Sequence, residues 1–193
     1  FGTTTATTIT EGAYPNFNVT WERAVKYNLG IEFGLFKDLL KGNFDLFSET
    51  RDNILTQYLS RPQWIGIEMA AGNLGKTKNS GFELELNHAR SISRNFDYLV
   101  GITLAHAKNV ILDMNEPDLK TDYRKREGHS IGQYFGLVCE GFITAADLAD
   151  PNRPLSTYGD VKVGDLKYKD VNKDGYIDDR DAMAIGYSDV PEN

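Results

Sequence analysis

The sequence predicts an all-β fold, an antiparallel sheet of the kind that forms a segment of a transmembrane β-barrel with long extracellular loops. Four segments alternate apolar and polar residues with a period of two, which sorts their side chains onto two faces. The connections between these segments are alternately short and long, an asymmetry typical of outer-membrane barrels. A soluble β-sandwich also alternates but has hairpins of more even length, so it remains the alternative.

The first predicted hairpin joins two alternating segments. From Tyr27 to Leu35 every odd-numbered residue is apolar, and every even-numbered residue is Asn, Gly or Glu. A tight turn is expected at 37–38. Residues 43–49 then alternate again until Phe47 breaks the pattern.

The second predicted hairpin follows a long irregular loop, 50–77. In its first strand, 82–88, Phe and Leu residues face one way and Glu and Asn residues the other. A short turn at 91–94 leads to the last strand, 96–108, whose second face is small or polar apart from Leu99. We expect the apolar faces to contact lipid and the charged, Gly-rich faces to line a wet or plugged lumen, because a tilted strand of roughly 9–11 residues crosses a bilayer.

The residues on either side of this four-strand region, 18–108, are predicted to be loops. Residues 1–17 are Thr-rich and form an irregular lead-in. Residues 109–193 are polar and rich in Pro, Gly and Asp, and they predict a long extracellular loop region in which Thr144 caps one short helix. The chain begins without Met or a signal peptide and ends without a closing element, so we expect it to be a piece of a longer protein.

Composition argues against several functions. The 21 Lys and Arg residues against 28 Asp and Glu leave a net charge of -7, which disfavours a nucleic-acid partner. The single cysteine, Cys139, excludes an internal disulfide and belongs to no Cys–His pattern, and the three histidines have no ligand spacing. Glu83 and Glu85 are spaced like glycosidase carboxylates, but such pairs also line barrel lumens. We therefore expect no enzyme.

The stretch AAGNLGKT, residues 70–77, fits a relaxed nucleotide-binding P-loop. A working P-loop needs a buried strand before it and a helix after it, so that backbone N–H groups converge on phosphate. Here an irregular segment, 61–69, precedes the stretch, a strand follows it, and Ala70 replaces the first Gly. The prediction is therefore no nucleotide binding, but a loop that re-enters the sheet with Lys76 and Lys78 at its wet rim.

One chemical motif has well-defined spacing: residues 170–181 match an EF-hand-type calcium loop. Gly175 stands at position 6, where the chain must turn sharply. Position 12 is Asp rather than Glu, and the segment before the loop is extended rather than helical, so a solvated acidic turn is the alternative. Calcium is favoured over magnesium as a structural cofactor because the site offers many protein oxygens. The predicted ligands, at positions 1, 3, 5, 7, 9 and 12, are Asp170, Asn172, Asp174, the Tyr176 carbonyl, Asp178 and Asp181.

Several passages resemble TonB-dependent outer-membrane receptors. Residues 18–36 resemble that family's N-x-x-W-E … Y-x-x-G-x-x-x-x-L-F passage, and residues 73–85 its N-x-G-x-x-x-N-x-G-x-E-x-E passage. Residues 136–142 (GLVCEGF) and 164–181 are similar to the SusC-like subfamily of Bacteroidetes. The resemblance runs from about residue 16 to 187.

This resemblance implies a plugged barrel of the 22-stranded class that spans the outer membrane and imports oligosaccharides or peptides. The TonB complex would supply energy, and a SusD-like surface lipoprotein would cover the extracellular loops. The quoted passages match none of the family's plug domain, TonB-contact segment or C-terminal strand, so we expect a middle-to-late barrel segment whose strands contact outer-membrane lipid. The alternatives are a soluble calcium-stabilised β-rich carbohydrate-binding module and, from AAGNLGKT alone, a nucleotide hydrolase.

Overall fold

The computed structural model describes residues 15–58, 70–117 and 121–190. The chain divides into two compact units, Phe1–Asp118 and Leu119–Asn193. Both contain mainly antiparallel strands, so the all-β prediction is confirmed. No helix in the described part of the chain is long and apolar enough to cross a membrane.

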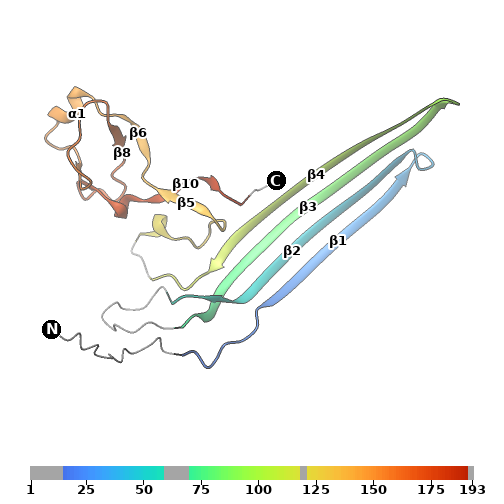
Figure 1. Ribbon diagram of the computed structural model, residues 1–193, viewed down its shortest axis with the longest axis horizontal. Coiled ribbons are helices and arrows are strands. Elements are labelled where there is room, and N and C mark those ends of the chain that lie inside the picture. Colours follow the sequence, from blue (N-terminus) through green and yellow to red (C-terminus); the bar gives the residue numbers. More distant parts are fainter. Residues whose placement is uncertain (1–14, 59–69, 118–120, 191–193) are drawn as a thin grey trace, which may run out of the picture. The chain divides into compact units, whose positions relative to one another are not determined.

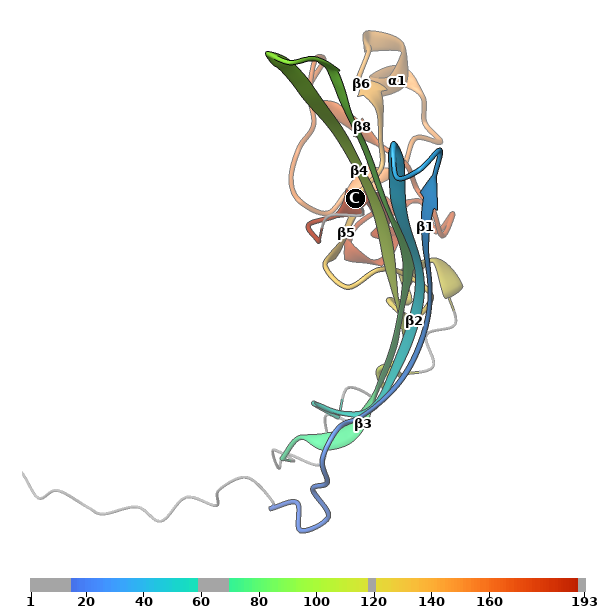
Figure 2. The same cartoon turned by 90° about the vertical axis from the view of Figure 1, so that its right-hand side faces the viewer.

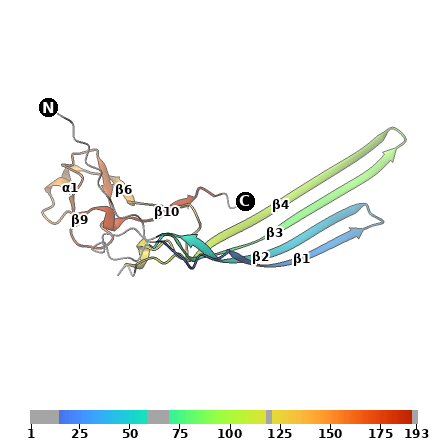
Figure 3. The same ribbon diagram turned by 60° about the horizontal axis from the view of Figure 1, so that its bottom comes forward.

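The first unit is one antiparallel sheet with strand order β1-β2-β3-β4 (Figure 1). Viewed from the side, its strands superpose into a single curved layer (Figure 2). The hairpin of β3 and β4 extends beyond the turn of β1 and β2 (Figure 3), because Leu40 at that turn pairs with His88, five residues before β3 ends. The four strands are β1 (Arg23–Leu35), β2 (Leu40–Thr56), β3 (Gly72–Ser93) and β4 (Phe96–Asp113).

The register aligns the apolar residues of all four strands into rows across one face of the sheet, which we call the apolar face. Leu29 on β1 is 60% exposed and Ile102 on β4 is 59% exposed, so no second layer covers this face among the described residues. Sheet-on-sheet packing would bury it, which removes support for a β-sandwich. The rows are Leu29–Leu46–Phe82–His106, Ile31–Phe44–Leu84–Leu104, Phe33–Gly42–Leu86–Ile102 and Leu35–Leu40–His88–Val100.

The strands are longer than the alternation predicts. β2 continues to Thr56 and β3 begins at Gly72, so both ends of the predicted loop 50–77 are strand and the connection is shorter. This part of β2 lacks alternation because it contains a β-bulge, where Asn53 has a φ of 57° and the pairing with β3 shifts. Backbone pairing rather than an apolar face therefore holds these residues in the sheet.

The two short turns lie close to their predicted positions. Residues 36–39 close the first hairpin, with Phe36, Lys37 and Asp38 all in the left-handed region of φ. The second turn comprises residues 94–95, because β3 extends through Ser93. Tight turns on one end and a longer connection on the other agree with the predicted asymmetry.

The second unit is not one featureless loop but a set of three small ladders. Thr144 caps the short helix α1 (Ala145–Ala149) as predicted, because its Oγ1 accepts from the Asp147 N–H and the Asp147 carboxylate accepts from the Thr144 N–H at 2.8 Å. Ile177 is the one buried hydrophobic side chain, at 6% exposure, within the described residues. The ladders pair β5 (Gln133–Gly136) with β10 (Met183–Ser188), β6 (Cys139–Phe142) with β8 (Leu166–Tyr168), and β7 (Leu155–Ser156) with β9 (Tyr176–Ile177); the 3-10 turns are η2 (Asp122–Arg124) and η3 (Asp179–Asp181).

Candidate functional site

The face of the sheet opposite the apolar face, which we call the polar face, carries four carboxylates in two adjacent rows. Gly30 makes room for one of them, because a Cβ there would lie 2.6 Å from the Asp45 carboxylate. Glu85 accepts a hydrogen bond from the Asn87 amide at 2.8 Å. The two rows are Gly30–Asp45–Glu83–Ala105 and Glu32–Asn43–Glu85–Thr103. This arrangement suits a water-filled or protein-filled interior and is unsuited to lipid.

Phe47, which interrupts the alternation, lies on the polar face for a structural reason. It pairs with Gly81 across β2 and β3, and a Cβ at Gly81 would lie 2.7 Å from the Phe47 ring. The same Cβ would collide with the backbone of β4 at His106 and Ala107. The aromatic ring therefore covers a glycine that the close approach of the strands requires.

Ion pairs gather at the end of the sheet next to the long connection. Arg51 contacts Glu49 at 2.9 Å and Glu22 at 3.5 Å, and Lys26 contacts Glu49 at 3.0 Å. A separate Arg23–Asp52 pair, at 2.7 Å, links β1 to the bulged part of β2. These exposed pairs each contribute little stability. The pairs of Lys26 and Arg51 with Glu49 compensate charge at this end of the polar face, whereas the Arg23–Asp52 pair lies on the apolar face by its register.

The stretch AAGNLGKT does not form a phosphate cradle. Its residues 72–77 belong to β3 and pair with β2, and the strand continues where a P-loop would begin a helix. Asn73 instead connects neighbouring segments: its amide donates to the carbonyls of Thr20 at 2.8 Å and Asn53 at 2.7 Å, and its carbonyl accepts from the Thr20 N–H at 2.8 Å. The stretch therefore has a structural role, because it connects neighbouring segments at the end of the sheet next to the long connection.

The first half of the predicted cation loop is brought together by side chain–backbone hydrogen bonds. The Asp170 carboxylate accepts from the N–H groups of Lys173 at 2.7 Å and Gly175 at 2.9 Å. Asn172 accepts from the Asp174 N–H at 2.8 Å. Gly175 has a φ of 84°, as the sharp turn at position 6 requires. The backbone thus takes the course that the spacing predicts.

The second half of the loop is arranged differently. Asp181 is fully buried and accepts from the N–H groups of Val171, Asn172 and Asp178. Arg180 lies 2.9 Å from Asp174 and 2.7 Å from Asp178, and its hydrogen bonds hold the pKa of Asp178 below its ordinary value. Tyr176 begins β9 with its side chain exposed. Among the described residues no three His, Cys, Asp or Glu side chains are arranged to hold a metal ion.

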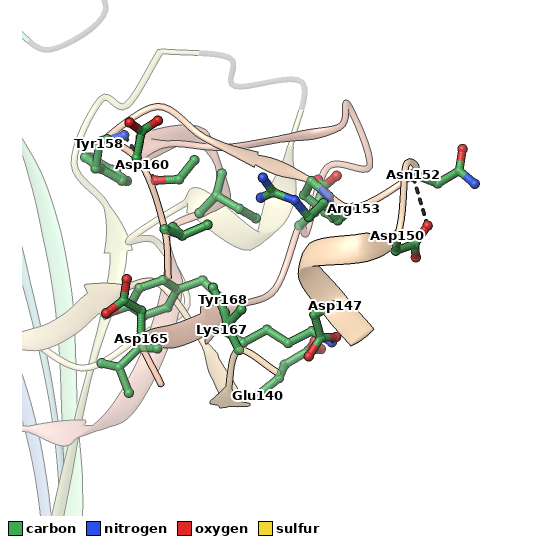
Figure 4. Close-up of a pocket in the computed structure, with 18 residues that line it drawn as sticks. Glu140, Asp147, Asp150, Asn152, Arg153, Tyr158, Asp160, Asp165, Lys167 and Tyr168 are labelled. Carbon is green, nitrogen blue, oxygen red and sulfur yellow. Dashed lines mark hydrogen bonds and ion pairs between the residues drawn. The ribbon is translucent and has the colours of Figure 1, made fainter. Parts of the chain in front are cut away.

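A cavity of about 530 Å³ lies within the second unit, between α1, β8 and the segment that follows α1 (Figure 4). Lys167 contacts Asp147 at 2.5 Å on its wall, and this hydrogen bond, reinforced by Thr144, holds the pKa of Asp147 far below its ordinary range. The Tyr158 hydroxyl donates to Asp179 at 2.5 Å, which raises the pKa of Tyr158 to about 12. The sequence did not predict this cavity, because its walls come from short segments without a common motif.

The comparison with known proteins decides the family. The β-barrel model of the TonB dependent receptor-like family matches residues 1–179. The chain belongs to this family. Members of this TonB-dependent receptor family are outer-membrane β-barrel transporters and not enzymes, so the predicted outer-membrane location is confirmed.

Two curated TonB-dependent receptors are similar to the chain. TonB-dependent receptor P26 of Formosa agariphila is 26% identical over 96% of the chain, which spans 19% of that protein. TonB-dependent receptor SusC of Bacteroides thetaiotaomicron is 25% identical over 69% of the chain, which spans 13% of that protein. The predicted resemblance to SusC-like receptors is thereby confirmed, and the chain spans about a fifth or less of each relative.

Solved structures show the same fold. The RagAB peptide importer matches with a TM-score of 0.66 in its open-open state, at 16% identity, over 94% of the chain and 19% of the solved chain. Its closed-closed state matches with a TM-score of 0.61, at 17% identity, over 92% of the chain and 19% of the solved chain. The four-stranded sheet therefore has the architecture of a barrel wall in this receptor family.

Proposed function

We propose that the chain forms part of the wall and extracellular loops of an outer-membrane transporter that uses TonB to import oligosaccharides or peptides. The observation that carries this proposal is the sheet itself, with exposed apolar rows on one face and carboxylates and glycines on the other. A water-soluble protein would leave those rows unprotected, whereas a bilayer covers them and the polar face borders the lumen.

The two edges of the sheet support a larger barrel. Within the described residues, β1 and β4 each have a strand partner on one side only. Each backbone group left unpaired in hydrocarbon costs several kcal/mol, so strands outside this sheet must complete the ladder. The small shares of the relatives that the chain spans, 19% and 13%, are in line with this requirement.

The proposed substrate and lipoprotein partner rest on relatives. One relative is the TonB-dependent receptor SusC, and the matched structures are those of the RagAB peptide importer. By analogy, a SusD-like lipoprotein would bind over the second unit, and the substrate would be an oligosaccharide or a peptide. The cavity between α1 and β8 and exposed aromatic side chains such as Tyr158 and Phe142 offer contact surface for either.

The transport proposal is tested on the full-length parent protein. We expect heat-modifiable mobility on gels, recovery in the outer-membrane fraction, and uptake of labelled oligosaccharide or peptide that stops when TonB is removed. Recovery in the aqueous fraction with no mobility shift would exclude the barrel. Uptake that persists without TonB would exclude TonB as the source of energy for transport.

We also propose that residues 170–181 bind a structural calcium ion. The turn at Gly175 and the ordering of Asp170 and Asn172 by backbone N–H groups support it, and Asp174 follows at the expected spacing. Arg180 would have to leave its two carboxylates as the ion enters. The calcium ion would have no catalytic role and would only stabilise the folded loop.

Thermal unfolding of the second unit within the full-length protein tests this ion. Calcium at a hundredfold excess over its dissociation constant should add about 2.7 kcal/mol to stability, and Asp170→Ala with Asp174→Ala should remove that gain. An equal gain with magnesium would reassign the ion. No cation-dependent change in the unmodified protein would exclude the site.

A further inference from the structure

Two lysines lie on the apolar face, just beyond the apolar rows and toward the long connection. Lys78 on β3 pairs with Val110, and Lys108 on β4 pairs with Ser80, so the two lysines are diagonal neighbours on one face. Diagonal neighbours of this kind are roughly 7–8 Å apart, and their Cβ atoms are somewhat closer. Both side chains are exposed, and neither has an ion pair or hydrogen bond within the described residues.

The two rows that hold these lysines contain hydroxyl groups and no acid, and Asp52 in the neighbouring row is held by Arg23 at 2.7 Å. Their rows are Val25–Thr50–Lys78–Val110 and Tyr27–Ser48–Ser80–Lys108, and the next row is apolar except for His106. On the polar face at the same height, by contrast, Lys26 is paired with Glu49. Arg23 on the apolar face is likewise paired, with Asp52, so Lys78 and Lys108 stand out as lysines without an ion pair in the part of the chain that the structure describes.

Two lysines beside a hydroxyl group and exposed apolar rows favour a ligand that has both an anionic group and hydrocarbon chains. Two ammonium groups and the Ser80 hydroxyl can donate together to one phosphate, and hydrogen bonds between charged partners are about twice as strong as neutral ones. The next two rows, which contain Phe82 and Leu84, form an exposed apolar surface along the strands. A soluble phosphate would contact only the lysine and serine donors. A lipid would contact the donors with its headgroup and the apolar surface with its acyl chains.

We propose that Lys78, Lys108 and Ser80 bind the phosphate of an anionic lipid headgroup at the membrane boundary on the side of the long loops. The site rests on the proposed function, because that function places the apolar face against lipid. Lys78 directly follows the stretch that resembles a P-loop, and the ligand proposed for it is a lipid phosphate at the barrel exterior, not a nucleotide.

Lipid retention by the full-length protein tests the site. The protein is purified from vesicles of equal parts phosphatidylglycerol and phosphatidylcholine, washed in detergent, and its retained lipid is counted by native mass spectrometry. We expect a preference for phosphatidylglycerol that falls about tenfold in the Lys78→Gln/Lys108→Gln variant, equivalent to about 1.4 kcal/mol. Lys41→Gln, which removes one positive charge from the polar face, should leave the preference unchanged.

Three outcomes would overturn the proposal: an undiminished preference in the double variant, an equal loss in Lys41→Gln, or displacement of the lipid by millimolar inorganic phosphate. Heat-modifiable mobility is measured on every variant. If the double variant does not fold, the single variants Lys78→Gln and Lys108→Gln must each show a partial loss. A protein that fails to shift on gels would refute the barrel, whereas a shifting protein without lipid preference would refute this site alone.

Discussion

Replacing Ile102 with Arg is the sharpest test of which face meets lipid. Ile102 lies in the row Phe33–Gly42–Leu86–Ile102 on the apolar face, six residues from Phe96 at the turn end and six from Lys108 at the loop end. Six residues extend about 20 Å along a strand, or about 14 Å of depth at a tilt near 45°. Ile102 is therefore expected close to the bilayer midplane.

The expected cost follows from that depth. An arginine on the lipid face of a barrel costs about 2–4 kcal/mol at the midplane and about 0–1 kcal/mol near the interfaces. Ile102→Arg should therefore lower the folding equilibrium constant by roughly 30- to 900-fold. Because Ile102 is 59% exposed in the isolated sheet, its replacement removes few protein contacts, so the loss of stability measures mainly the bilayer contact.

Thr103 provides the matched control because it is the next residue and points to the opposite face, in a row with Glu32 and Glu85. Thr103→Arg should change stability by less than about 0.5 kcal/mol. Guanidinium titration of the full-length protein in lipid vesicles, followed by gel mobility, measures both variants. Equal costs, or a larger cost for Thr103→Arg, would refute the assignment of the faces.

Three further predictions concern packing and pH. Gly81→Ala should destabilise the barrel strongly, because its Cβ would collide with the backbone of β4, whereas Gly101→Ala meets only a side chain and should cost much less on the same gel assay. Because the folded pKa of Asp147 is lowered, its stabilisation of α1 should persist above about pH 4 and fade below it, measured by amide exchange and absent in Asp147→Asn. The Tyr158 phenol should ionise near pH 12, so the step in phenolate absorbance near that pH should be missing in Tyr158→Phe. The folding stability that this group contributes should be lost as pH rises through that value. Ionisation near pH 10 would contradict the hydrogen bond to Asp179.

The positions of the strands and their two faces could be predicted from the sequence because alternation reports a local geometry. Every apolar residue expected on one face between Tyr27 and Leu35 is found there, and the register extends the same face across β2, β3 and β4. Thr144 and Asp147 similarly encode the start of α1, because a capping box needs only residues that are three apart.

The strand ends could not be predicted in the same way. Residues 50–56 and 109–113 carry no clean alternation, yet they belong to β2 and β4 because neighbouring strands supply their hydrogen bonds. The P-loop-like stretch is likewise ambiguous in sequence, and pairing with β2 decides that it is a strand. A strand end that is held only by hydrogen bonds to a neighbouring strand cannot be predicted until the position of that neighbour is known.

The candidate sites divide along the same line. Sequence alone determined the spacing of the loop residues 170–181, the sharp turn at Gly175 and the alternation of the wall, since each depends on neighbours within one segment. Only the tertiary structure decided that Arg180 pairs with the loop carboxylates, that a cavity opens beside α1, and that Lys78 and Lys108 share one face. These features join residues from different segments, and their contacts exist only after the backbone ladders set the register.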